Sequence, residues 1–445
     1  MDSAIDLEHS LRENFGFSSF RPGQREVMEI LLAGRRSLAV FPTGSGKSLC
    51  YQLPALLLNG LTLVVSPLIA LMKDQVESLQ ERGLSAARLD STLEADEVRE
   101  IYAAIDQGSL KLLYVAPERL ANEGFLRRLR RTRIDLLAID EAHCISEWGH
   151  NFRPDYLKLS QLADSLGIER VLGLTATATP KVAADIRRHF AIADRDHVQT
   201  GFRRPNLAYH VTPCSADERA GLLIQRLREH PVGASIVYVT LQQTAETVAK
   251  ALKNAGFSAK AYHAGLRDEH RAKVQEEFMD GTCTIVVATI AFGMGIDKAD
   301  IRYVYHYNLP KSLENFSQET GRAGRDGEPA RCEVLACGDD RIVLENFVYG
   351  DTPSNSALKS LVERLLLQGD RFDISRYELS GSLDIRPLVI ATALTYLELQ
   401  GILLPRGPFY GGYKFQFLHD RERILAGHTP EPVSYTHLTL PTKIV

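Results

Sequence analysis

The chain is poor in cysteine and has no two cysteines at the C-x-x-C spacing. The six that it contains are scattered over 445 residues, at Cys50, Cys144, Cys214, Cys283, Cys332 and Cys337. In sequences, disulfide frameworks and zinc sites are recognised by several cysteines at characteristic spacings. We therefore expect reduced thiols, no zinc and a cytoplasmic protein, with Cys332 and Cys337 buried in a strand instead of forming half a metal site.

Long apolar runs and an excess of positive charge are missing too. No stretch approaches the roughly 18 apolar residues of a membrane span. The first residues, Met1 to Asp6, lack the basic-then-apolar layout of a signal peptide. The formal net charge is −4, so any nucleic-acid surface must be local. We expect a monomer with no membrane partner.

A glycine-bearing turn follows the apolar run Ser37–Phe41 and reads P-T-G-S-G-K-S over Pro42–Ser48. Backbone N–H groups of such a turn cradle phosphates, a lysine neutralises them and a hydroxyl reaches Mg²⁺. The strict motif has Gly where this chain has Phe41, and an ordinary Gly-rich turn is the alternative. The predicted nucleotide-binding residues are Thr43, Gly44, Ser45, Gly46, Lys47 and Ser48, with Lys47 also catalytic and Ser48 also a metal ligand.

A second apolar run, Leu136–Ile139, ends in Asp140-Glu141-Ala142-His143. This pattern is typical of a buried parallel strand with acids at its carboxyl end. Asp140 is the predicted Mg²⁺ ligand, and Glu141 the predicted residue that orients or deprotonates the attacking water. The alternative is a pair of acids that caps a helix.

Strand-like and helical segments alternate twice along the chain. Strands are expected near residues 37–41, 61–65, 111–115, 134–139 and 170–174, and again near 235–239, 284–288, 302–307 and 331–335. Strand–helix alternation predicts parallel sheets covered on both faces. We expect an α/β protein with two such domains, residues 1–205 and 206–342, and with the nucleotide between them.

The pattern changes after about residue 340. Two short helices are expected over 374–383 and 386–399, followed by a β hairpin over 401–405 and 407–417. For residues 343–432 this pattern predicts a small helical or winged-helix-like region, or alternatively a helical cap on the second domain. Residues 433–445 do not fit what precedes them, and we interpret them as a non-native tail.

Over residues 7–341 the motifs resemble the RecQ family of DNA helicases, a branch of helicase superfamily 2. The matching segments are Phe15–Phe17 with Phe20–Gln24, Val65–Gln75, Val115–Arg119, Thr175–Thr177, Tyr262–Leu266, Ala288–Asp297 and Gln318–Gly327. The resemblance implies two tandem RecA-like domains that use ATP and Mg²⁺. It also implies that Gln24 reads the adenine edge, Phe17 stacks on the ring and Arg21 assists.

Two arginines of the second predicted domain supply the positive charge that a nucleotide site in the first domain alone would lack. Arg322 and Arg325 are three residues apart, so on a helical turn they face the same way. An arginine that reaches across a cleft stabilises charge on the transferred phosphoryl group. We predict Arg325 as this arginine finger and Arg322 as a sensor of closure; surface arginines after a glycine turn are the alternative.

The segment Cys144–Tyr156 resembles the aromatic-rich loop of the family and holds the only Trp of the chain. Aromatic side chains stack on bases without sequence preference, although core aromatics are the alternative. The resemblance places Ser66, Trp148, Phe152, Arg153 and Thr289 against DNA. Two features depart from the family: Val239–Gln243 lacks the usual arginine, and the four-cysteine zinc module is absent, as in the zinc-lacking branch.

The sequence therefore predicts an ATP-dependent DNA helicase that moves 3′→5′ on single strands and opens forked duplexes in repair or recombination, at the bacterial nucleoid. The alternative is an RNA- or DNA-stimulated ATPase that remodels its partners without unwinding. A P-loop kinase or GTPase is disfavoured because it needs no paired arginines in a second sheet.

Overall fold

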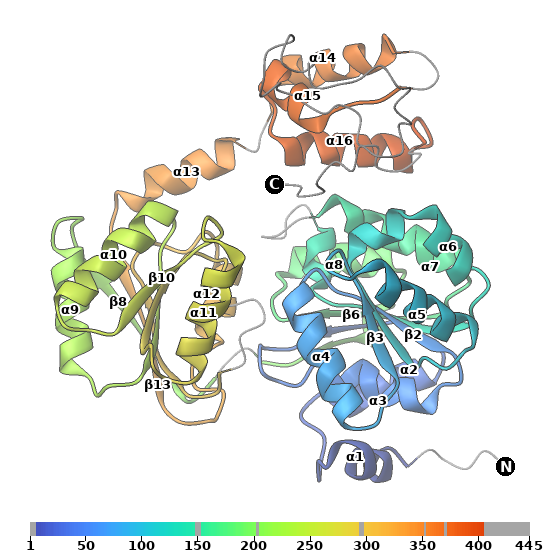
Figure 1. Cartoon of the computed structure of the whole chain (residues 1–445), viewed down its shortest axis with the longest axis horizontal. Helices are drawn as coiled ribbons and strands as arrows, with labels where there is room; N and C mark the ends of the chain where they lie inside the picture. Colours follow the sequence, from blue (N-terminus) through green and yellow to red (C-terminus); the bar gives the residue numbers. More distant parts are fainter. Residues whose placement is uncertain are drawn as a thin grey trace, which may run out of the picture.

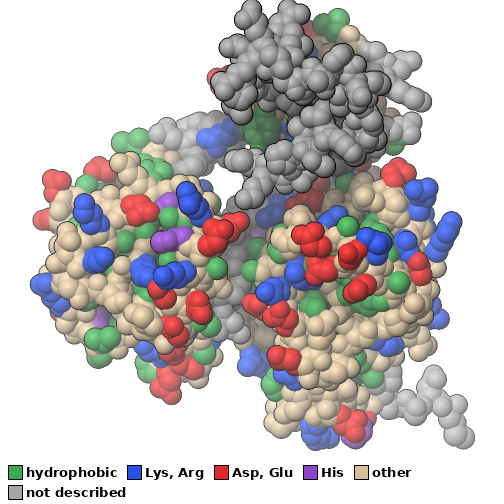
Figure 2. All heavy atoms as spheres, in the orientation of Figure 1, with side chains coloured by type: hydrophobic (Ala, Val, Ile, Leu, Met, Phe, Trp, Pro, Cys, Tyr) green, Lys and Arg blue, Asp and Glu red, His purple; other side chains and the backbone are tan. Residues whose placement is uncertain are grey.

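The computed structural model describes residues 6–146, 153–201, 204–292, 298–350, 353–368 and 372–404. Figure 1 shows two α/β lobes side by side, with a group of helices above the first lobe. The first lobe holds a seven-stranded sheet and the second a six-stranded sheet. On the face drawn in Figure 2, acidic and basic side chains are interspersed over both lobes.

Every strand pair in the first lobe is parallel, and the order is β3-β4-β2-β5-β6-β1-β7. The strands are β1 (Ser37–Val40), β2 (Leu61–Val65), β3 (Ala86–Leu89), β4 (Leu112–Val115), β5 (Ile134–Ile139), β6 (Arg170–Thr175) and β7 (His197–Gln199). The central strands β1, β2 and β4 are buried along their whole length. Such continuous apolar runs are typical of parallel strands covered on both faces.

Helices cover both faces of this sheet. One face packs on α1 (Leu7–Phe15), α2 (Gln24–Leu32), α3 (Leu49–Leu57) and α4 (Ile69–Glu81). The other packs on α5 (Ala95–Asp106), α6 (Glu123–Leu129), α7 (Leu159–Ser165) and α8 (Pro180–His189). The short 3₁₀ segments η1 (Pro117–Ala121), η2 (Ala142–Ile145), η3 (Pro154–Lys158) and η4 (Asp194–Asp196) complete the lobe.

The second lobe repeats the plan, with strand order β10-β11-β9-β12-β13-β8 and parallel pairs throughout. Its strands are β8 (Leu207–Pro213), β9 (Ala234–Tyr238), β10 (Ala259–Tyr262), β11 (Ile285–Ala288), β12 (Ile301–His306) and β13 (Ala330–Ala336). Its helices are α9 (Arg219–Glu229), α10 (Gln242–Asn254), α11 (Asp268–Met279) and α12 (Leu313–Thr320). The predicted α/β class with two parallel sheets is confirmed.

Four strands escaped the sequence prediction, and they are the outer strands of the two sheets: β3, β7, β8 and β10. An edge strand is paired on one side only and carries polar or exposed residues. In β8, for example, four consecutive residues from Ala208 to Val211 are exposed. Without a continuous apolar run, the pattern that identified the buried strands is missing.

Four helices follow the second sheet: α13 (Asp340–Gly350), α14 (Asn355–Leu366), α15 (Arg376–Leu383) and α16 (Pro387–Leu399). The last two confirm the predicted helices over 374–383 and 386–399. Helix α16 packs on η3 of the first lobe, where Lys158 pairs with Glu398, so the region contacts the lobe that is distant in sequence.

Residues 401–404 form no strand, which corrects the start of the predicted hairpin. The remainder of that hairpin lies outside the described residues. Across the described ranges, no helix has the length and apolar character required for a membrane span.

Candidate nucleotide site between the two lobes

The predicted phosphate loop joins β1 to α3 at the carboxyl end of the first sheet. Gly44 and Gly46 have φ of 81° and 75°, a conformation that favours glycine. The Ser45 hydroxyl donates to the Pro42 carbonyl at 2.6 Å, and Lys47 Nζ donates to the Phe41 carbonyl at 3.2 Å. Hydrogen bonds within the loop therefore fix its conformation, and they hold the Lys47 ammonium group at the base of the loop.

Phe41, which replaces the motif glycine, is a core residue. Its side chain is fully buried, and a Cβ atom added at Gly23 would lie 2.8 Å from its ring. Gly23 also has a φ of 81°. The aromatic ring thus packs the loop against the turn that starts α2, and this contact explains why a side chain is tolerated at position 41 and excluded at position 23.

The predicted adenine-reading residues contact the phosphate loop. Gln24 is buried, and its amide nitrogen donates to the carbonyls of Ser45 and Gly46 at 3.1 and 2.9 Å. Its amide oxygen accepts from the Arg21 backbone at 2.8 Å, and the Arg21 guanidinium donates to the Gly44 carbonyl. Because these groups are occupied, adenine recognition by Gln24 requires an exchange of partners. Half of the Phe17 side chain is exposed, which leaves its ring available for stacking.

The two acids follow β5 directly. Asp140 Oδ2 accepts from the Ser66 hydroxyl at 3.1 Å, and Asp140 Oδ1 accepts from the Glu141 backbone at 3.0 Å. The Tyr156 hydroxyl donates to the Asp140 carbonyl at 3.0 Å. Glu141 adopts a left-handed backbone with φ of 49°. Strained non-glycine residues of this kind concentrate at functional sites.

Electrostatics at the acids suit a cation. Burial, with repulsion from Glu141, raises the pKa of Asp140 to about 7, and burial raises the pKa of Glu141 against the opposing charges of Lys47 and Arg322. Burial also lowers the pKa of Lys47. Two desolvated carboxylates that repel each other fit a hard divalent cation such as Mg²⁺, which prefers oxygen ligands.

His143 was not among the predicted site residues. Its Nδ1 lies 2.9 Å from Thr175 Oγ1 and 3.3 Å from Glu141 Oε2, and burial lowers its pKa to about 3. Thr175 Oγ1 in turn donates to the Thr177 carbonyl at 2.9 Å. The neutral imidazole thus connects the acids to the segment Thr175–Thr177 after β6. Its position two residues after Glu141 was the signal that could have identified it.

The two predicted arginines face the first lobe, although not from a helix. Helix α12 ends at Thr320, and residues 321–326 form turns, which corrects the helical spacing that we expected. A Cβ atom added at Gly44 would lie 3.6 Å from Arg325 Cγ, and one added at Gly321 would lie 3.3 Å from Thr43 Cβ. Arg322 interacts with the Tyr238 hydroxyl and with the charge of Glu141. The site is therefore formed by both lobes.

Two residues of the connection between the lobes, Arg204 and Asn206, hold the turn of residues 321–326 that carries the two arginines, called the arginine turn below. The Arg204 guanidinium donates to the carbonyls of Gly321, Ala323 and Gly324. Asn206 Nδ2 donates to the carbonyls of Gly324 and Glu328 at 2.8 and 2.9 Å. A Cβ atom added at Gly324 would lie 2.5 Å from Asn206 Nδ2. Neither residue was a predicted site residue, because the carbonyl groups that they bind lie more than 115 residues away in the sequence.

The predicted DNA contacts are less complete. Trp148 and Phe152 lie outside the described residues. Arg153 is partly exposed and lies 3.8 Å from Glu118 of η1. Ser66 and Thr289 stand at the carboxyl ends of β2 and β11 with 2% and 9% of their surface exposed, and Ser66 is engaged with Asp140. A role in DNA binding remains a prediction for all five.

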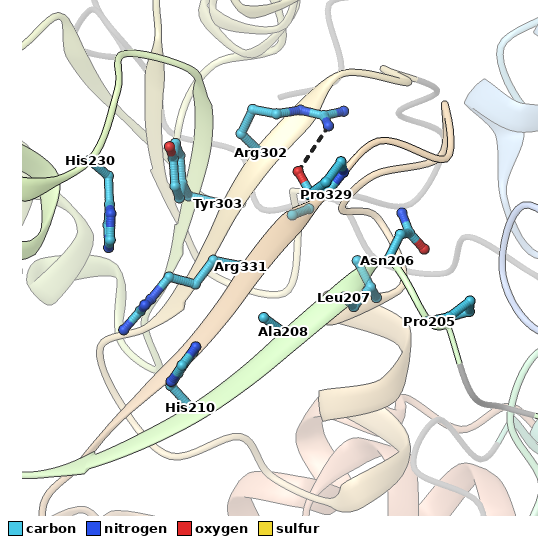
Figure 3. Close-up of a pocket in the computed structure, with 11 residues that line it drawn as sticks. Pro205, Asn206, Leu207, Ala208, His210, His230, Arg302, Tyr303, Pro329 and Arg331 are labelled. Atoms are coloured by element: carbon cyan, nitrogen blue, oxygen red, sulfur yellow. Dashed lines mark hydrogen bonds between the residues drawn. The ribbon is translucent and has the colours of Figure 1, made fainter.

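A separate cavity of about 420 Å³ lies in the second lobe, at the amino ends of β8, β12 and β13. In Figure 3, His230 lies beside the Tyr303 ring, with centroids 5.5 Å apart, and Arg302 donates to the Pro329 carbonyl at 3.1 Å. Ligands of parallel α/β sheets bind at the carboxyl ends. This cavity lies at the opposite, amino ends. Asn206 lines it and also holds the arginine turn, whose Gly324 N–H donates to the carbonyl of Ile301 at the start of β12 at 2.9 Å, so the cavity lies next to that turn.

Comparison with known proteins agrees with this geometry. Residues 21–186 match the DEAD/DEAH box helicase model, and residues 218–327 match the helicase conserved C-terminal domain model. Two solved structures share the fold, each with a TM-score of 0.59. The helicase Lhr of Mycobacterium smegmatis, bound to single-stranded DNA and AMP-PNP, is 21% identical over 86% of this chain and 55% of that chain. Dbp5 of S. cerevisiae, bound to RNA and ADP BeF3, is 16% identical over 78% and 90%. The two lobes thus match two helicase domain models, one model for each lobe.

Curated relatives narrow the assignment. The chain is 41% identical to the probable ATP-dependent DNA helicase RecS of Bacillus subtilis, over 81% of this chain and 72% of the relative. It is 44% identical to the ATP-dependent DNA helicase RecQ of Pasteurella multocida over 75% of this chain, and 43% identical to the RecQ-like DNA helicase blm-1 of Caenorhabditis elegans over 78%. The chain belongs to the RecQ family of superfamily 2 helicases. It spans 52% and 36% of the length of the last two relatives.

Proposed function

We propose that the protein is an ATP-dependent DNA helicase that moves 3′→5′ along single strands and opens forked duplexes. The observation that carries the proposal is the contact of Arg325 with Gly44, because it brings a cation of one lobe onto the phosphate loop of the other. A site divided in this way is complete only when the lobes close, so ATP binding and hydrolysis alternate between closed and open states.

Each predicted residue has a chemical task in this scheme. Lys47 binds the β and γ phosphates, and Ser48 with Asp140 would hold Mg²⁺. The metal, when bound, neutralises charge on the phosphate oxygens. Glu141 orients the attacking water or accepts its proton. Arg325 stabilises the charge of the transferred phosphoryl group, while Arg322, beside Glu141 and Tyr238, senses closure.

Unwinding needs this cycle for an energetic reason. Separating one base-pair step costs about 1.4 kcal/mol on average. Stacking of an opened base on an aromatic ring contributes about 1–3 kcal/mol, so Trp148 and Phe152 suffice to trap one step. Repetition requires that the grip be released and reset, and the opening of the lobes after hydrolysis supplies that reset.

We also propose that the protein acts as a monomer on nucleoid DNA during repair or recombination. The decisive experiment is strand displacement by the full chain with ATP and Mg²⁺, using forked duplexes whose single-stranded arm is either 3′ or 5′. We expect displacement with the 3′ arm only. ATPase activity that DNA stimulates without displacement of either substrate would favour the remodeller instead, and matched RNA strands would test the RNA alternative.

A further inference from the structure

A line of buried polar side chains runs through the first lobe from α4 to the phosphate loop. Gln52 Nε2 of α3 donates to Gln75 Oε1 of α4 at 2.9 Å and to the Tyr114 hydroxyl of β4 at 3.3 Å. The Tyr114 hydroxyl donates to the Tyr51 hydroxyl at 3.3 Å. The backbone N–H groups of Tyr51 and Gln52 donate to the carbonyl of Ser48, the residue at the start of α3, at 3.2 and 3.0 Å. Together these five residues are called the relay below.

The interior of the relay is sealed from water. Gln52, Tyr51 and Tyr114 expose only 9%, 3% and 1% of their surface, and the two rings meet edge to face at 6.1 Å. Both rings belong to the apolar cluster under α1 to α4. A buried polar group is costly unless it is hydrogen-bonded, so leucine or phenylalanine would fill these positions at lower cost if packing were their only task.

The hydroxyl groups also keep one protonation state. Burial raises the pKa of Tyr114 to about 12 and raises that of Tyr51. Near neutral pH both therefore remain hydroxyl groups that donate and accept hydrogen bonds. The relay is consequently suited to hold positions and unsuited to transfer charge.

Its two ends lie in segments of different function. Gln75 is partly exposed on α4, at the end of the segment Val65–Gln75 that resembles a strand-contacting motif. Ser48 belongs to the phosphate loop. We propose that the relay couples strand binding at α4 to the position of Ser48, with Gln52 and Tyr114 as positioning residues that touch neither DNA nor nucleotide. This inference rests on the proposed function.

The coupling arises because the buried side chains of the relay have few alternative hydrogen-bond partners. A buried donor that loses its acceptor cannot replace it with water, so a broken link costs more than an exposed one. A displacement of α4 by a bound strand is therefore followed by Gln52, and then by the hydroxyl groups of Tyr114 and Tyr51. The backbone hydrogen bonds from Tyr51 and Gln52 to the Ser48 carbonyl, in the first turn of α3, carry the displacement to Ser48.

The test compares the wild-type chain with Tyr114→Phe and Gln52→Leu, which keep volume and remove one link each. ATPase rates are measured without and with a single-stranded oligonucleotide, together with the half-saturating Mg²⁺ concentration and the affinity for the labelled strand. A single hydrogen bond predicts about a threefold loss in stimulated rate, with basal rate and strand affinity within about twofold of wild type. The half-saturating Mg²⁺ concentration with DNA should rise.

The matched control is Tyr305→Phe in β12. Tyr305 is as deeply buried as Tyr114, and among the described residues its hydroxyl has no hydrogen-bond partner. We expect this variant to retain the stimulation by DNA. The relay is excluded if Tyr114→Phe and Gln52→Leu keep the wild-type ratio of stimulated to basal rate, or if both rates fall equally. If DNA does not stimulate the ATPase of the wild-type chain, the proposed function is wrong, and the proposed coupling is wrong with it.

Discussion

Arg325 of the second lobe lies on Gly44 of the first, so close that a Cβ atom at Gly44 would stand 3.6 Å from Arg325 Cγ. The positive φ of Gly44 and its small size let the guanidinium stem cover the phosphate loop. The two residues are 281 positions apart in the chain. Under the proposed function, this contact makes ATP hydrolysis on the first lobe depend on the position of the second.

Arg325→Ala should lower the ATPase kcat on the order of 10³-fold, the usual contribution of an arginine finger. Arg325→Lys should restore little, because an ammonium group lacks the planar fork of the guanidinium. ATP binding, measured with a fluorescent analogue, should change far less than kcat. Arg341→Ala, at an exposed position of the second lobe, is the control; equal losses in both variants would remove Arg325 from the site.

Lys47→Ala should abolish ATP turnover in the presence and absence of DNA. The ammonium group is held at the base of the phosphate loop by two backbone carbonyls, and no other lysine lies in the segment Pro42–Ser48. Steady-state ATPase measurement checks this, with thermal unfolding to verify that the variant is folded. Turnover close to that of the wild type would show that Lys47 is not needed.

Asn206→Ala should impair catalysis through the arginine turn. Its two hydrogen bonds to the carbonyls of Gly324 and Glu328 fix the backbone around Arg325. Each hydrogen bond is worth about 1 kcal/mol, so the loss of both should lower kcat about 30-fold, while the KM for ATP changes less. Asn206→Asp keeps an acceptor but loses the donor, and it should resemble Ala. A change in KM alone would argue against a positioning role.

Glu333→Gln tests how the edge strand β8 is attached to β13. Glu333 is fully buried, and despite desolvation its pKa is lowered by hydrogen bonds from Thr212, Arg226 and Arg331. Because the pKa of Glu333 is lower in the folded than in the unfolded state, its ionised form stabilises the fold at pH values above the unfolded pKa of about 4.3. This contribution to stability is lost as the pH falls through the folded-state pKa.

Chemical unfolding of wild type and Glu333→Gln should therefore differ most at pH 7, and the difference should shrink only below about pH 4.3. The control is Glu363→Gln, whose side chain is exposed beside Lys359. This exposed pair should contribute at most about 1 kcal/mol at any pH. A difference for Glu333→Gln that stays constant down to acid pH would contradict the charged network.

Several features of the fold followed from local pattern. The buried strands β1, β2, β4, β5 and β6 were predicted within one or two residues because a parallel strand covered on both faces is a continuous apolar run. The edge strands were missed because exposure on one side removes that run.

The sequence by itself determined the phosphate loop, the acids after β5 and the family, since each is a contiguous set of residues whose chemistry depends on short spacing. Tertiary structure alone decided that Arg204 and Asn206 hold the arginine turn, that the amide of Gln24 is engaged with the loop, and that Tyr114 lies next to Tyr51. Hydrogen bonds are directional over about 3 Å. Which distant groups come that close is determined by the packing of whole helices and strands, and no local pattern records it.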